Sequence, residues 1–290
     1  DYTWAWNQIS AIGERSQQSN LALQLARELS EKYPYLAQAW CNLSAQCEDR
    51  EEKLSYIRKA SAVNPLFQNA YSALADYYRE MGDYHQALAV FKDTPWGEEL
   101  PFQLASLRAQ IYAQTGQYEN AVEILQTLLI GTEGNTHLWQ KLYEWLYQLD
   151  RKPDIVKGSY KQIELNRHDA NSLCIASEML SLHGSENDKK EADKHLIRAH
   201  TLAPNDQYIA LTLADVLMEK QAFSDALATL LDFERFSTST FATARKIMCY
   251  LALDELSRAL SLYKDLLNDL DADYWSLNKP FEELIKKLGF

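Results

Sequence analysis

A spacing of 34 residues recurs along this chain and limits the folds that the chain can adopt. The same residue returns after one period at Trp6 and Trp40, Gly82 and Gly116, Tyr84 and Tyr118, Ala87 and Ala121, and Ala192 and Ala226. A fixed period of this length is typical of stacked helix-turn-helix units, each of which buries its apolar face against its neighbours. The period therefore predicts an all-α array.

One stretch near the middle of the chain shows the unit most clearly. Tyr71, Leu74 and Tyr78 are spaced three and four residues apart, which places them on one face of a helix. Gly82 follows where the backbone needs a left-handed turn to end that helix. Ala87 then lies in a second helix. The following unit repeats this order around Gly116, so we expect pairs of helices joined by tight turns.

The residues at these positions resemble the tetratricopeptide repeat. The match uses a large residue, a Leu or Ile, and a small residue on the first helix, then Ala and Pro along the second: Trp6, Ile9, Ser10, Ala22 and Pro34 in the first unit, and Trp40, Leu43, Ser44, Ala60 and Pro65 in the second. The resemblance covers nearly the whole chain. It implies a right-handed superhelical solenoid whose first helices line an inner, concave face.

We expect a single solenoid over residues 1–290, with about eight repeats and a C-terminal capping helix. The predicted repeats are 3–36, 37–67, 68–101, 102–135, 136–168, 169–206, 207–239 and 240–270, followed by a cap at 271–290.

Some segments depart from the period. The second unit is about three residues short, which we assign to its inter-helix turn at 48–52, and a polar insertion at 183–188 is predicted to be an exposed loop. Residues 271–279 break the phase, and we expect a short helix from Pro280 to Leu288 with Phe281, Leu284, Ile285 and Leu288 facing inward. The first repeat has no comparable cap, which makes a dimer through the N-terminal end conceivable.

Charge and composition exclude several classes of partner. The formal net charge is −12, from 41 acidic and 29 basic residues, and such a chain repels phosphate backbones, so we expect no nucleic-acid partner. No apolar run is long enough for a membrane helix, so we expect no membrane insertion. The four cysteines lie in apolar helical patterns without a CxxC pair, which favours buried thiols and a cytoplasmic location.

Motifs that carry catalysis are missing from the sequence. It contains no phosphate-binding glycine loop, no HExxH and no GxSxG, and His195 and His200 are five apart, on different faces of a helix. We therefore expect no enzyme activity, no cofactor and no metal.

Helical phase predicts which side chains face a partner. The expected concave-face residues are Asn7, Asn42, Asn69, Asp76, Arg79, Gln110, Lys141, Glu144, Tyr208, Leu211, Met218, Phe241, Arg245 and Met248. The N-terminal part of this set is rich in amides that hydrogen-bond an extended peptide, and the C-terminal part carries the aromatic and Met side chains that anchor a partner.

Chaperone-tail binders of this family use a clamp of Lys, Asn, Asn, Lys and Arg. The matching positions here hold Asn7, Ala11, Asn42, Asn69 and Ala73, so only Asn42 agrees and the clamp is absent. We expect a non-enzymatic scaffold that binds a partner peptide or protein in its groove. Two alternatives stay open: an accessory, substrate-docking region of a larger enzyme such as a glycosyltransferase, and a component of a trafficking or envelope secretion and assembly complex.

Overall fold

The structure is a computed structural model that describes residues 21–269 and 272–288. These residues form helices and no strand, which confirms the predicted all-α class. The chain divides into two compact units, residues 1–131 and 132–290, and each is described by itself.

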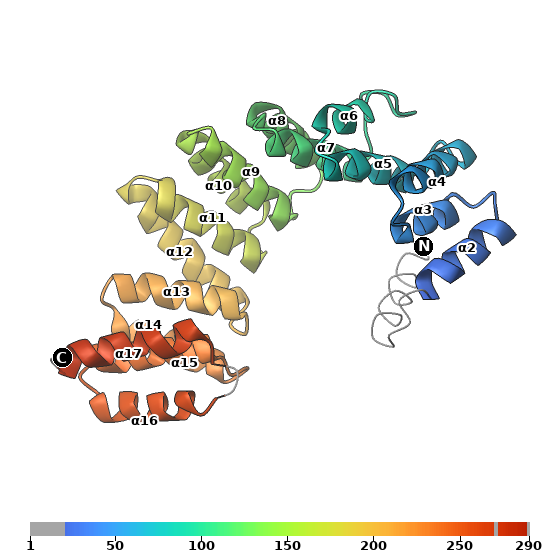
Figure 1. Cartoon of the computed structure of the whole chain (residues 1–290). Coiled ribbons are helices and arrows are strands. Elements are labelled where there is room, and N and C mark those ends of the chain that lie inside the picture. The colour runs from blue at the N-terminus through green and yellow to red at the C-terminus, as the bar shows by residue number, and fades with distance from the viewer. Residues whose placement is uncertain (1–20, 270–271, 289–290) are drawn as a thin grey trace. The chain divides into compact units, whose positions relative to one another are not determined.

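The first unit contains helices that pack in sequence order (Figure 1). They are α2 (Leu21–Lys32), α3 (Ala37–Gln46), α4 (Arg50–Val63), α5 (Gln68–Glu80), α6 (Tyr84–Ala89), α7 (Phe102–Gln114) and α8 (Tyr118–Leu128). α3 pairs with α4, α5 with α6 and α7 with α8, and each pair stacks on the next.

The second unit continues the same alternation of first and second helices. It contains α9 (Thr136–Gln148), α10 (Lys152–Leu165), α11 (Ala170–His183), α12 (Glu186–Leu202), α13 (Gln207–Glu219), α14 (Phe223–Glu234), α15 (Thr240–Ala252), α16 (Leu256–Leu267) and α17 (Tyr274–Leu288). α17 packs mainly against α15 and less against α16.

Small residues allow the second helices to approach their neighbours closely. Ala60, Ala87, Ala121, Ala226 and Ala259 are all fully buried. Larger apolar side chains fill the space around these alanines, for example Phe91 and Leu104 around Ala87 in the first unit. The alanine that recurs with the period is therefore a packing requirement, because a larger side chain would push the helices apart.

Five of the turns between paired helices share a left-handed backbone conformation. Gly82 and Gly116 adopt φ values of 74° and 75°, as their position at a helix end requires. In the second unit the same conformation is adopted by Asp150 at 54°, Gln221 at 61° and Asp254 at 61°. The later turns therefore keep the shape of the earlier ones although they lack glycine, and their side chains add strain that glycine would avoid.

The predicted exposed loop at 183–188 is wrong. α11 extends to His183 and α12 begins at Glu186, so only two residues separate them. Ser185 caps α12, and the Asp188 side chain accepts a 2.8 Å hydrogen bond from the backbone N–H of Ser185. This capping box makes a polar sequence a helix start. The extra residues lengthen α12 to 17 residues.

The shortened second unit also differs from our expectation. The missing residues come from the first helix, because α3 has 10 residues where α5, α7 and α9 have 13. The segment 50–52, predicted as turn, is already helical because the Asp49 side chain accepts a 2.8 Å hydrogen bond from the backbone N–H of Glu52 and caps α4.

The C-terminal helix keeps the period that the sequence appeared to lose. α17 begins at Tyr274, which is 34 residues after the start of α15 at Thr240, and it contains Pro280 instead of starting there. Asp273 caps it by accepting a 2.7 Å hydrogen bond from the backbone N–H of Ser276. α17 therefore occupies the phase of a further first helix.

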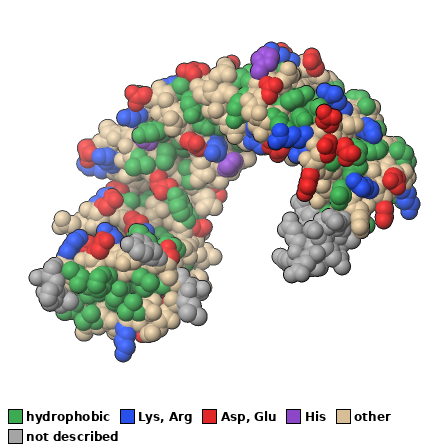
Figure 2. All heavy atoms as spheres, in the orientation of Figure 1, with side chains coloured by type: hydrophobic (Ala, Val, Ile, Leu, Met, Phe, Trp, Pro, Cys, Tyr) green, Lys and Arg blue, Asp and Glu red, His purple; other side chains and the backbone are tan. Residues whose placement is uncertain are grey.

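The inward face of α17 was predicted only in part. Leu284 is buried, whereas Phe281 is 48% exposed and stacks on Tyr263 of α16, with ring centroids 6.3 Å apart. The buried positions among the described side chains of α17 are Ser276, Pro280 and Leu284, which follow one another at intervals of four residues. Figure 2 shows hydrophobic side chains gathered over α17.

Candidate partner-binding surface

The predicted surface residues of the first unit lie on α3, α5 and α7, except Asn7, which lies outside the described residues. Asn42 is only 9% exposed and its Oδ1 accepts a 2.7 Å hydrogen bond from Nε2 of Gln38. Asn69 and Gln110 are half-buried. Asn42 therefore serves the packing of α3, and Asn69 and Gln110 remain accessible in part.

Asp76 and Arg79 form an ion pair on α5, with Arg79 Nη2 2.8 Å from Asp76 Oδ1. Burial raises the pKa of the Asp76 carboxyl, and the charge of Arg79 opposes this shift. The two side chains compensate each other one helical turn apart, so this part of α5 presents a neutral polar pair.

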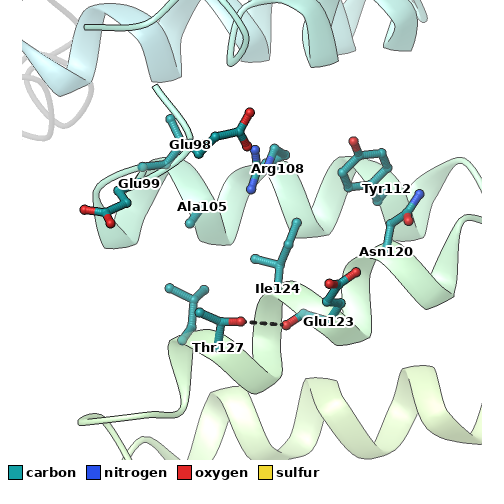
Figure 3. Close-up of a pocket in the computed structure, with 11 residues that line it drawn as sticks. Glu98, Glu99, Ala105, Arg108, Tyr112, Asn120, Glu123, Ile124 and Thr127 are labelled. Carbon is teal, nitrogen blue, oxygen red and sulfur yellow. Dashed lines mark hydrogen bonds between the residues drawn. The ribbon is translucent and has the colours of Figure 1, made fainter. Parts of the chain in front are cut away.

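A pocket of about 620 Å³ lies between α7 and α8 of the first unit (Figure 3). Arg108 stands in it, 34 residues from both Leu74 and Leu142, at a position where those repeats carry an apolar side chain. Figure 3 shows the guanidinium of Arg108 and the carboxylate of Glu98 pointing toward each other. Glu99 and Glu123 also line the pocket, so its charged residues are predominantly acidic. The sequence analysis did not identify this pocket.

On α9 of the second unit, Lys141 and Glu144 form an ion pair of 2.9 Å, and both side chains are substantially exposed. Tyr147, one turn further along, is 55% exposed, and its ring centroid lies 5.6 Å from that of His183 on α11. This helix therefore presents charged and aromatic groups together.

Tyr208 of α13 reaches across to α11. Its hydroxyl donates to the carboxylate of Glu178, with distances of 2.7 Å and 2.9 Å to the two oxygens, while half of the side chain stays exposed. Burial raises the pKa of Glu178, and the hydrogen bond from Tyr208 lowers it in part. Burial and the bond to Glu178 also raise the pKa of Tyr208.

Arg245 of α15 joins three helices. Its guanidinium binds both carboxylate oxygens of Asp215 on α13, at 2.6 Å and 2.7 Å, and lies 4.7 Å from the ring centroid of Trp275 on α17. Phe241 also contacts Trp275, with ring centroids 6.0 Å apart. A bidentate contact between an arginine and a carboxylate fixes the orientation of the two groups as well as their distance, so Arg245 aligns α13 and α15. Phe241 keeps 36% of its surface exposed.

The three remaining predicted residues are half-buried. Leu211 and Met218 of α13 pack against the core formed by α13, α14 and α15, and Met248 lies on α15. Their apolar surface is therefore shared between the core and the surface.

Sequence reasoning missed Glu178 and Trp275. Two cross-helix hydrogen-bonded pairs that involve predicted residues, Tyr208 with Glu178 and Arg245 with Asp215, join positions 30 residues apart. This separation is one repeat less one helical turn, which is how side chains of successive parallel first helices meet. A search for complementary groups at that spacing would have found them.

The described residues contain no cluster of metal-ligating side chains, and their cysteines are free thiols. No three His, Cys, Asp or Glu side chains come together there as a possible metal site. Cys41, Cys174 and Cys249 are buried free thiols and Cys47 is partly exposed. Burial raises the pKa of the Cys174 thiol to about 12 and that of Cys249 to about 11, so both thiols stay protonated near neutral pH.

Residues 21–269 and 272–288 include no helix with the length and apolar character needed to cross a membrane.

Comparisons with known proteins identify the repeat. Family models described as "Tetratricopeptide repeat" match residues 70–94 and 103–129, which contain α6 and α8 and most of α5 and α7. Among curated protein sequences, no match was found.

The chain is also similar to several solved structures. Yeast Tom70 matches with a TM-score of 0.53 and 15% identity over 92% of this chain and 57% of its own. A tetratricopeptide repeat protein from Parabacteroides merdae matches with a TM-score of 0.47 and 17% identity, over 90% of this chain and 99% of its own. YrrB, described as a TPR protein with an unusual peptide-binding site, matches with a TM-score of 0.41 and 16% identity, over 65% of this chain and 96% of its own. The sequence matches identify two adjacent tetratricopeptide repeats in this chain, and the likeness to Tom70 shows the same helical repeat fold.

Proposed function

We propose that the chain is a non-enzymatic scaffold that binds a protein or peptide partner across its first helices. The observation that carries the proposal is the placement of exposed aromatic side chains on these helices: Tyr147 on α9, Tyr208 on α13 and Phe241 on α15 keep 55%, 51% and 36% of their surfaces accessible. Aromatic side chains held by neighbours but open on one face are the groups that dominate binding at protein interfaces.

Hydrogen bonds and ion pairs hold this surface in shape before a partner arrives. Glu178 accepts a hydrogen bond from the hydroxyl of Tyr208 and holds it in place. The ion pair between Asp215 and Arg245 holds α15 against α13, one helical turn from Phe241. A preformed surface loses little conformational entropy on binding, which favours affinity. The proposal includes a single array over residues 1–290, no catalytic role and a cytoplasmic location, the last supported by the buried free thiols.

The test is capture of partners by the immobilised full chain from a lysate of the cells that produce it. We expect Tyr208→Ala combined with Phe241→Ala to lose specific bands, and Asp76→Lys to test the first unit separately. The matched control is Leu231→Ala with Phe236→Ala, which removes side chains that are 42% and 57% exposed on and just after the second helix α14.

Loss of capture in the first-helix variants, with the control unchanged and helicity retained by circular dichroism, supports the proposal. Unchanged capture by both first-helix variants would overturn it and direct attention to the second helices.

A further inference from the structure

The face formed by α11 and α13 combines exposed apolar groups with carboxylates that lack a cation. Glu178 and Asp193 of α11 and α12, and Asp215 and Glu219 of α13, line one pocket of about 230 Å³. Two of the four have a basic partner, Asp193 with Lys220 and Asp215 with Arg245. Among the described side chains, no basic group pairs with Glu178 or Glu219.

Glu178 is the carboxylate in this pocket that would gain most from a cation. Its carboxylate is partly removed from water, and its hydrogen-bond partner is the uncharged hydroxyl of Tyr208. A desolvated anion that is hydrogen-bonded but not charge-neutralised gains more from an incoming cation than a solvated one, because the intervening dielectric is lower.

The pocket has the dimensions of a side-chain socket. Small-molecule pockets usually have volumes of about 300–1,000 Å³, and this one is smaller. Its wall includes Leu182, which is 70% exposed, and the exposed ring of Tyr208 lies beside it through the bond to Glu178. Apolar surface next to a negative socket suits the long methylene stem and charged end of a lysine or arginine.

We infer that this face binds a partner segment in which Lys or Arg side chains are interleaved with apolar ones, and that the pocket between α11 and α13 receives one of the basic side chains. The inference rests on the proposed function and specifies the partner that the function needs. Charge complementarity supplies selectivity and Leu182 and Tyr208 supply apolar contact.

The experiment measures fluorescence anisotropy of a labelled short peptide that alternates lysine with leucine and alanine, titrated with the full chain. Matched peptides carry glutamine or glutamate in place of lysine. We expect the lysine peptide to bind tightest and the glutamate peptide weakest, with affinity for the lysine peptide falling as salt rises.

Variants then localise the site. Glu178→Gln with Glu219→Gln is expected to weaken binding of the lysine peptide about tenfold. Ser181→Lys, which places a cation at the pocket wall, is expected to block it. The matched control, Glu164→Gln with Glu191→Gln, removes the same charge from the second helices α10 and α12, where both carboxylates pair with a basic residue of their own segment. It is expected to retain binding.

Equal binding of the lysine and glutamine peptides, or equal weakening by the control variant, would overturn the inference. Circular dichroism of each variant separates loss of binding from loss of folding, and Ser181→Lys tests the pocket while leaving all four of its carboxylates in place. If these peptides show no preference while Tyr208→Ala with Phe241→Ala still abolishes partner capture, the proposed function stands and the basic partner is wrong.

Discussion

The hydroxyl of Tyr143 on α9 donates a 2.7 Å hydrogen bond to Oε1 of Gln162 on α10, and both side chains are almost fully buried. A polar pair in an apolar core contributes little net stability when complete but costs about 1–3 kcal/mol when one partner is lost. We predict that Tyr143→Phe lowers the free energy of unfolding by that amount, measured by urea unfolding.

The double variant Tyr143→Phe with Gln162→Met is the control, because it removes both polar groups. It should lose less stability than the sum of the single variants. A purely additive result would show that the hydrogen bond is not energetically coupled.

Gly158 of α10 faces the side chains of Tyr143 and Trp139 of α9. A Cβ at this position would be 3.2 Å from Cε1 of Tyr143, whose ring is held in place by Gln162. Alanine favours a helix by about 1 kcal/mol over glycine. We nevertheless predict that Gly158→Ala lowers the melting temperature of the native chain. In a Tyr143→Ala background, the same substitution should raise the melting temperature. An increase in the native background would contradict close packing at this site.

Gln221 adopts a left-handed conformation with φ of 61° between α13 and α14. A side chain in this region costs about 1–2 kcal/mol that glycine does not pay. We predict that Gln221→Gly raises the free energy of unfolding by about 1 kcal/mol in thermal denaturation, because it places at this turn the residue type that Gly82 and Gly116 provide in the earlier turns. Ala222→Gly, at the following residue with φ of −85°, should lower it. Equal effects of the two variants would contradict local strain.

Lys246 of α15 is 3% exposed, and its Nζ lies 2.5 Å from Oε1 of Glu234, which closes α14. Removing one partner from a buried pair leaves an uncompensated charge and costs about 3–5 kcal/mol. We predict such a loss for Glu234→Ala in chemical denaturation. Lys246→Met should be nearly neutral or stabilising, because the side chain of Glu234 is 41% exposed and can be solvated. A large loss with Lys246→Met would refute this account.

Glu178 should make stability depend on pH. The pKa of Glu178 in the folded chain lies above its usual value of 4.5, so the folded state binds more protons than the unfolded state. The free energy of unfolding therefore falls as the pH rises from 4.5 to the raised pKa. We predict that Glu178→Gln raises the melting temperature at pH 7 and that the difference disappears below pH 4.5. A difference that does not change with pH would show that charge is not its cause.

Positions that recur with the period were predictable, because each repeat meets the same packing demand. The first helices α5, α7, α9 and α11 begin at residues 68, 102, 136 and 170, and the periodic alanines are buried. Departures were harder to predict. The polar segment 183–188 gave no apolar pattern, and its helical start depends on the hydrogen bonds between Ser185 and Asp188.

By itself the sequence determined the helical class, the pairing of helices and the side chains that pack in each repeat, because those depend on local periodicity and on contacts between neighbouring repeats. The tertiary structure decided how individual side chains are used. It buried Asn42, left Phe281 exposed, and joined Glu178 to Tyr208 and Arg245 to both Asp215 and Trp275. These outcomes depend on how closely adjacent helices approach and on how their side chains are oriented, and the period along the chain specifies neither.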